Sequence, residues 1–222
     1  AVEICKAYGL NHIDLRFPVD ELPDMSRVEA TLKENPDIRL VYTTHNETGT
    51  GICNPIREIG ALAHRYGATF VVDTTSTLAM RPIDVARDNI DFCMASAQKG
   101  IMAMTGLSFV IGRTDLIVAS KDYPKRSYYC NLYLQYEYFE KTGQMHFTPP
   151  VQTVYAAVQG LKEYFAEGET AKWERHKRVF EAIHAGLDEL GFKDVIRREW
   201  QSGLVVSVLY PDDPNWDFTV SY

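Results

Sequence analysis

Hydrophobic and polar positions switch repeatedly between helical and strand-like spacing along the chain. Residues 1–8 have helical spacing and end at Gly9, a typical helix stop, and residues 12–17 alternate as a strand does. Residues 28–35 are again amphipathic at helical spacing, and residues 38–44 are strand-like. The pattern predicts two helix–strand units, with Asp24 and Ser26 at the start of the second helix.

The next segment repeats the unit. Pro55 opens a run at 56–66 whose apolar residues share one helical face, Gly67 follows as a stop, and residues 69–73 form an apolar strand. After Pro82 the spacing predicts a short helix at 83–90 and strands at 91–100 and 107–112.

Such alternation predicts an α/β fold with a mostly parallel sheet and flanking helices. Ligands bind such sheets at the carboxyl ends of the strands. Here those ends carry His45, Asp73 and Lys99.

The pattern changes after Pro149. Helices are predicted at 151–168 and 169–191, and a strand at 202–210, whereas 127–140 is a tyrosine-rich packing surface. We therefore expect a large domain over 1–167 and the beginning of a smaller C-terminal α+β domain over 168–222.

Composition narrows the class of protein. The net charge of −7 and the absence of a Lys/Arg stripe argue against a nucleic-acid partner, and no apolar run reaches the ~18 residues of a membrane helix. We expect a cytoplasmic protein. The cysteines form no C-x-x-C pair, so neither a disulfide framework nor a metal site is expected: Cys5, Cys53, Cys93 and Cys130.

Three polar segments, 45–51, 73–76 and 96–100, follow predicted strands. Lys99 ends a small-residue run, where an amine can face a cofactor instead of solvent; a lone lysine is otherwise a surface cation. Asp73 either caps the next segment or pairs with the ring nitrogen of pyridoxal phosphate (PLP), which keeps the ring protonated as an electron sink.

The stretches HNETGTGICNP, VVDTTSTLAMRPID and IDFCMASAQKG, in this order and separation, resemble the class V, fold-type I PLP aminotransferases. The segment from RSYYCNLY to HFTPPVQTVYA resembles the branch that transfers the amino group of 2-aminoethylphosphonate to pyruvate. The resemblance implies a PLP-binding large domain and transamination, giving phosphonoacetaldehyde and alanine.

By position, the resemblance implies that Lys99 is the Schiff-base lysine and Asp73 the partner of the ring nitrogen. It places Thr75 against the cofactor ring, and Gln98 and Thr48 near the phenolic oxygen. These five residues are the expected cofactor contacts.

Other positions are less specific. Thr148 matches the residue that reaches the cofactor phosphate of the neighbouring subunit, which implies a homodimer, or it caps the following helix. Arg126 either binds a phosphonate or carboxylate group of the substrate through its guanidinium or is a surface arginine. His45 and Glu47 are expected to form a buried pair that supports the loop, and Gly49 and Gly51 to let the loop turn tightly.

Members of this family also have a phosphate-binding loop, a ring-stacking aromatic and a carboxylate-binding arginine that are not found in these residues. We therefore expect the natural polypeptide to extend at both ends. Three alternatives remain: an alanine or serine:glyoxylate aminotransferase, a cysteine desulfurase, and a non-catalytic scaffold. The desulfurase is disfavoured because Gln98 stands where a histidine is usual.

Overall fold

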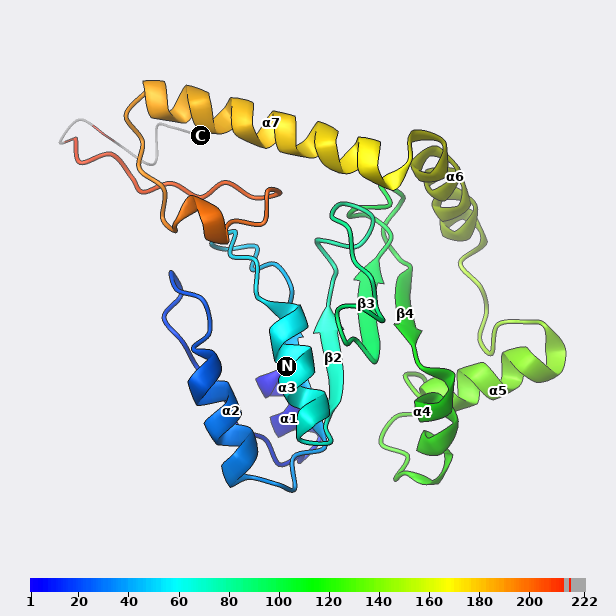
Figure 1. Ribbon diagram of the computed structural model, residues 1–222. Helices are drawn as coiled ribbons and strands as arrows, with labels where there is room; N and C mark the ends of the chain where they lie inside the picture. Colours follow the sequence, from blue (N-terminus) through cyan, green and yellow to red (C-terminus); the bar gives the residue numbers. More distant parts are fainter. Residues whose placement is uncertain (214–215, 217–222) are drawn as a thin grey trace.

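The computed structural model describes residues 1–213 and 216 (Figure 1). Its helices alternate with strands in the first half and follow one another in the second. The helices are α1 (Val2–Ala7), α2 (Met25–Glu34), α3 (Ile56–Arg65), α4 (Thr114–Ala119), α5 (Leu132–Thr142), α6 (Val151–Glu167) and α7 (Glu169–Glu189), with 3₁₀ turns η1 (Ser120–Asp122) and η2 (Arg198–Trp200).

The sheet has four strands in the order β1-β2-β3-β4: β1 (Leu40–Thr44), β2 (Thr69–Asp73), β3 (Phe92–Ser96) and β4 (Ser108–Gly112). The first three are parallel, and β4 runs antiparallel to β3. The predicted α/β fold with a mostly parallel sheet is confirmed.

The predicted start of α2 and the predicted buried face of α3 are also confirmed. The Asp24 carboxylate accepts the backbone N–H groups of Ser26 and Arg27 at the start of α2. Ile56 and Ile59 of α3 pack against the sheet beside Phe70. Burying these side chains contributes roughly 1.5–3 kcal/mol each, which fixes α3 on the sheet.

Residues 12–17 do not form the predicted strand. Their alternation instead places Leu15 and Phe17 against a small core that contains Val28, Leu32 and Leu62. Apolar packing of an extended segment gives the same period of two as a paired strand, and this segment pairs with no strand among the described residues.

Residues 83–90 form a hydrogen-bonded turn instead of the predicted helix. The Asp84 carboxylate accepts the N–H groups of Ala86 and Arg87, as a helix cap would. Asn89 then adopts a left-handed conformation, with φ of 57°, which ends the helical conformation after a single turn.

The strand predicted at 202–210 is also wrong, because only an isolated bridge of Val208 with Asp194 forms there. Conversely, α5 lies within the tyrosine-rich segment that the sequence pattern left without a helix. Its apolar and polar residues are mixed around the helix, and none of them is buried, so it has no clear helical stripe.

The last helices of the chain lie at one end of the sheet (Figure 1). In Figure 1, α7 passes over one end of the sheet, with α6 at its start and the C-terminal segment at its far end. Gly168, with φ of +86°, joins α6 to α7; the domain boundary predicted there remains a prediction. No helix of the described part is long and apolar enough to cross a membrane.

Candidate active site

The Asp73 carboxylate lies at the carboxyl end of β2, in the centre of the parallel part of the sheet. Asp73 is in register with Thr44 of β1 and Met94 of β3. Its Oδ1 accepts the backbone N–H of Thr75 at 2.8 Å, and its Oδ2 accepts the Tyr42 hydroxyl at 3.3 Å. These two donors fix the orientation of the carboxylate.

Tyr42 was not anticipated from the sequence as part of the site. Burial raises the pKa of its hydroxyl, and the negative charge of Asp73 raises it further. The phenol therefore stays protonated and keeps donating to Asp73. The sequence signal was weak, because a tyrosine inside an apolar strand is more often a packing residue.

Lys99 lies in a tight turn just beyond the end of β3. The Met102 N–H donates to the Lys99 carbonyl at 2.8 Å, and the Ala103 N–H donates to the Ala97 carbonyl at 2.9 Å. The Lys99 side chain is exposed, and its Nζ has no hydrogen-bond or ion-pair partner within the described ranges. The amine is therefore available for bonding.

Gly100 links the lysine turn to the segment that follows Asp73. A Cβ at Gly100 would lie 2.0 Å from the carbonyl oxygen of Leu78 and 2.7 Å from Met80 Cγ. Leu78 belongs to the turn that begins at Thr74, where its N–H donates to the Thr74 carbonyl. The structure therefore places the backbone next to Lys99 against the turn that follows Asp73.

The remaining predicted cofactor contacts surround this edge. Thr75 is half-buried and held through its N–H on Asp73, whereas Gln98 and Thr48 are exposed, with their side chains available. The pKa of Glu47, next to Thr48, is raised by desolvation and by the nearby Asp73 charge. The loop after β1 therefore lies close to Asp73.

The loop that contains Thr48 is closed by backbone hydrogen bonds. The N–H of Gly51 donates to the Glu47 carbonyl at 2.7 Å, and that of Glu47 donates to the Ile52 carbonyl. Gly51 has φ of +83°, and a Cβ there would lie 2.8 Å from the Val205 carbonyl oxygen. Glycine is thus required at Gly51, whereas a Cβ at Gly49 would meet nothing within 4 Å.

The expected buried pair of His45 and Glu47 does not form. His45 is buried, and its Nδ1 lies 3.0 Å from the Thr77 hydroxyl, while Glu47 is exposed. Burial and the positive charge of Arg81 lower the pKa of His45 to about 4. The loop is thus supported by a neutral histidine, because the chain turns Glu47 outward after the buried Asn46.

The buried neutral His45 makes stability depend on pH. In the unfolded chain, His45 takes up a proton below about pH 6.5, whereas in the folded chain it does so only below about pH 4. Stability is therefore full above the higher value and falls by about 3 kcal/mol as the pH drops through this window. In urea unfolding at about pH 7 and about pH 4.5, His45→Gln should lose about 2–3 kcal/mol less than the wild type. Equal losses in both proteins would contradict a buried neutral histidine.

Two predicted residues lie apart from this edge. Arg126 is exposed, and its Nη1 donates to the Tyr8 carbonyl at 2.7 Å; no contact joins it to the other predicted site residues in the described part of the chain. Thr148 is exposed. The cap expected from Thr148 does not form, because the N-cap position of α6 is Pro150, two residues after Thr148, and α6 has no side-chain cap.

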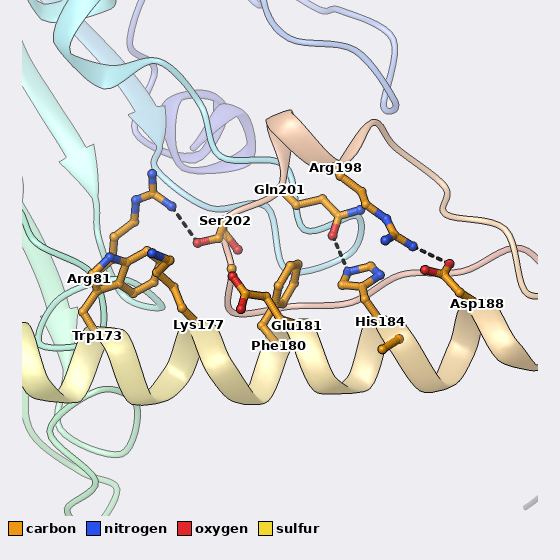
Figure 2. Close-up of a pocket in the computed structure, with 12 residues that line it drawn as sticks. Arg81, Trp173, Lys177, Phe180, Glu181, His184, Asp188, Arg198, Gln201 and Ser202 are labelled. Carbon is orange, nitrogen blue, oxygen red and sulfur yellow. Dashed lines mark hydrogen bonds and ion pairs between the residues drawn. The ribbon is translucent and has the colours of Figure 1, made fainter.

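A hollow of about 400 Å³ lies between α7 and the segment that contains Arg198 and Gln201 (Figure 2). Within it, Arg81 donates to the Ser202 carbonyl, and His184 Nε2 lies 2.8 Å from Gln201 Oε1. None of the predicted cofactor or substrate residues lines it. The His184–Gln201 contact joins α7 to the C-terminal segment, and the Arg81–Ser202 bond joins the same segment to the chain after β2.

Comparison with known proteins defines the class of protein to which the chain belongs. The model of the class-V aminotransferase family matches residues 1–211. The chain belongs to the class-V aminotransferase family, whose members are PLP-dependent.

Among curated proteins, the chain is 38% identical to the 2-aminoethylphosphonate–pyruvate transaminases of Salmonella heidelberg and Salmonella typhimurium, over 100% of this chain and 60% of each relative. The chain thus spans about three fifths of the length of these relatives.

Solved structures show the same fold. Alanine–glyoxylate aminotransferase from Nostoc sp. superposes with a TM-score of 0.89 over 95% of this chain and 56% of its own, at 23% identity. Pyridoxamine-pyruvate aminotransferase from Mesorhizobium loti gives a TM-score of 0.81 over 89% and 51%, at 26% identity. These neighbours confirm the fold-type I architecture.

The residues at the strand ends fit PLP chemically. Asp73 offers an oriented carboxylate to a protonated ring nitrogen, and Lys99 offers an amine without a competing partner among the described residues. The Ser96 hydroxyl at the end of β3 and the Asn46 Oδ1 after β1 are buried polar atoms that have no hydrogen-bond partner among the described residues. Buried polar atoms normally have hydrogen-bond partners. These two atoms are therefore available to form hydrogen bonds with a ligand at this edge.

Proposed function

We propose that this chain carries the cofactor lysine and the ring-nitrogen carboxylate of an aminotransferase that passes the amino group of 2-aminoethylphosphonate to pyruvate. The products would be phosphonoacetaldehyde and alanine. The observation that carries the proposal is that Asp73 ends β2 and the Lys99 turn follows the adjacent parallel strand β3, with Gly100 of this turn packed against Leu78. The 38% identity to transaminases of that name supports the substrate.

Each residue has a defined task in this proposal. Lys99 would hold PLP through its amine, and the same amine would serve as the base that accepts the proton from the substrate carbon that bears the nitrogen. Asp73 keeps a proton on the ring nitrogen, and Tyr42 and the Thr75 N–H hold Asp73 in place. Bound PLP supplies an electron sink for the charge left at that carbon.

The other predicted residues complete the proposal. Thr75 would lie against the cofactor ring, and Gln98 and Thr48 would donate hydrogen bonds near its phenolic oxygen. Thr148, exposed on the segment before α6, would reach the cofactor phosphate of a second subunit in a homodimer. Arg126 would offer its remaining guanidinium nitrogens to a substrate oxyanion.

A donor and acceptor screen on the full-length protein tests the function. With pyruvate as acceptor, 2-aminoethylphosphonate should give alanine and phosphonoacetaldehyde at a rate far above those of serine or pyridoxamine as donors. Initial rates should show ping-pong kinetics. Faster turnover of alanine or serine with glyoxylate would replace this proposal by the glyoxylate alternative, and a colourless, inactive protein would support the scaffold.

A further inference from the structure

Lys172 is a buried cation without an acidic ion-pair partner among the described residues. It lies in the first turn of α7 and is 3% exposed. Its Nζ donates to the Gly100 carbonyl at 2.5 Å and lies 5.2 Å from the centre of the Tyr164 ring. Lys172 therefore bonds to the carbonyl of the residue that directly follows Lys99.

This position is unfavourable for a lysine on general grounds. Burial disfavours the charged amine and lowers the pKa of Lys172. The first turn of a helix carries partial positive charge, which repels a cation. Only the Gly100 carbonyl and the Tyr164 ring offset these costs by direct contact. Solvent exposure or a neutral residue would avoid the cost, so helix formation alone does not explain a lysine here.

The bond from Lys172 is one of three close contacts that fix residues 99–101. Gly100 lies against the Leu78 carbonyl with no space for a Cβ. Gly160 of α6 lies against the Ile101 carbonyl, where a Cβ would be 2.4 Å from the oxygen. Leu78, α6 and α7 therefore hold the same short turn.

We propose that Lys172 is a positioning residue for Lys99. Its charge-assisted hydrogen bond fixes the Gly100–Ile101 peptide, one peptide group after Lys99, and thereby the turn that sets the direction in which the Lys99 amine leaves the sheet edge. This inference rests on the proposed function for its catalytic consequence, whereas its structural part concerns only the turn at 99–102. A misplacement of a reacting group by ~1 Å can cost about 100-fold in rate.

The test uses Lys172→Met, which keeps an apolar chain of similar length and removes the charge and donor. The matched control is Lys162→Met, at an exposed lysine on the neighbouring helix α6. In the cofactor-free full-length protein, hydrogen exchange of the Met102 amide, which bonds to the Lys99 carbonyl, should become at least about tenfold faster in Lys172→Met. The second half of α7 should exchange as in the wild type, and the control should change neither region.

The loaded enzyme provides a second readout. Lys172→Met should lower kcat by about 10- to 100-fold while the KM for the amine donor changes less than about threefold. Unchanged exchange at Met102, or equally accelerated exchange throughout α6, α7 and the sheet, would overturn the positioning role. If Lys172→Met does not fold, Lys172→Gln is judged by the same criteria. Because exchange is measured without cofactor or substrate, failure of the proposed function would appear separately, in the wild-type donor screen.

Discussion

Lys99→Ala is expected to abolish covalent attachment of PLP and to lower turnover by roughly 10⁴-fold or more. Proton transfer by a positioned group accounts for about 10²–10⁴ of this loss, and loss of the covalent link adds to it. The side chain is exposed and has no partner in the described ranges, so its removal should leave the fold intact. Visible absorbance of the purified protein and single-turnover rates with the amine donor measure the two effects.

The control for this variant is Lys162→Ala, at another exposed lysine. It should retain wild-type absorbance and rate. Added methylamine should restore part of the activity to Lys99→Ala, because a free amine can replace the missing base. A Lys99→Ala protein that keeps its visible absorbance and turns over at wild-type rate would remove Lys99 from the mechanism.

Asp73→Asn is expected to bind PLP and yet lose about 100-fold or more in kcat. The amide is nearly isosteric, so its oxygen can still accept the Thr75 N–H. It carries no charge, however, and no longer favours a proton on the ring nitrogen. A hydrogen bond between charged groups contributes up to about 3 kcal/mol, and this energy corresponds to roughly 100-fold in rate.

The control for the second variant is Asp37→Asn, an exposed carboxylate distant from the carboxyl ends of the strands. It should have wild-type kinetics and wild-type affinity for the cofactor. Replacing PLP by an analogue with a carbon in place of the ring nitrogen should lower the wild-type rate but leave Asp73→Asn nearly unchanged. If both proteins lost activity to the same degree with this analogue, Asp73 would have no role at that nitrogen.

The sequence predicted correctly those elements whose start and stop residues agree with the face that the fold buries. α3 follows a proline, ends before Gly67 and buries a single apolar face on the sheet. For residues 12–17 the same signal was ambiguous, because Leu15 and Phe17 pack against helices without pairing as a strand. A periodic pattern reports which face is buried and does not report the backbone partner.

The candidate site was predictable only in part for a similar reason. Asp73 and Lys99 follow strands directly, so the parallel order of the sheet places them at one edge. Tyr42 and Lys172 reach that edge from the middle of a strand and from a helix far along the chain. Their roles depend on register and on the docking of α7, which no local pattern contains.

The Lys99 amine is expected to hold the cofactor at the carboxyl edge of the sheet. Borohydride reduction of the PLP-loaded full-length protein, followed by digestion and mass spectrometry, tests it directly. The predicted result is one pyridoxyl-phosphate addition per chain, on the peptide that contains Lys99. Addition at another lysine, or no addition to a protein that still turns over substrate, would contradict the claim.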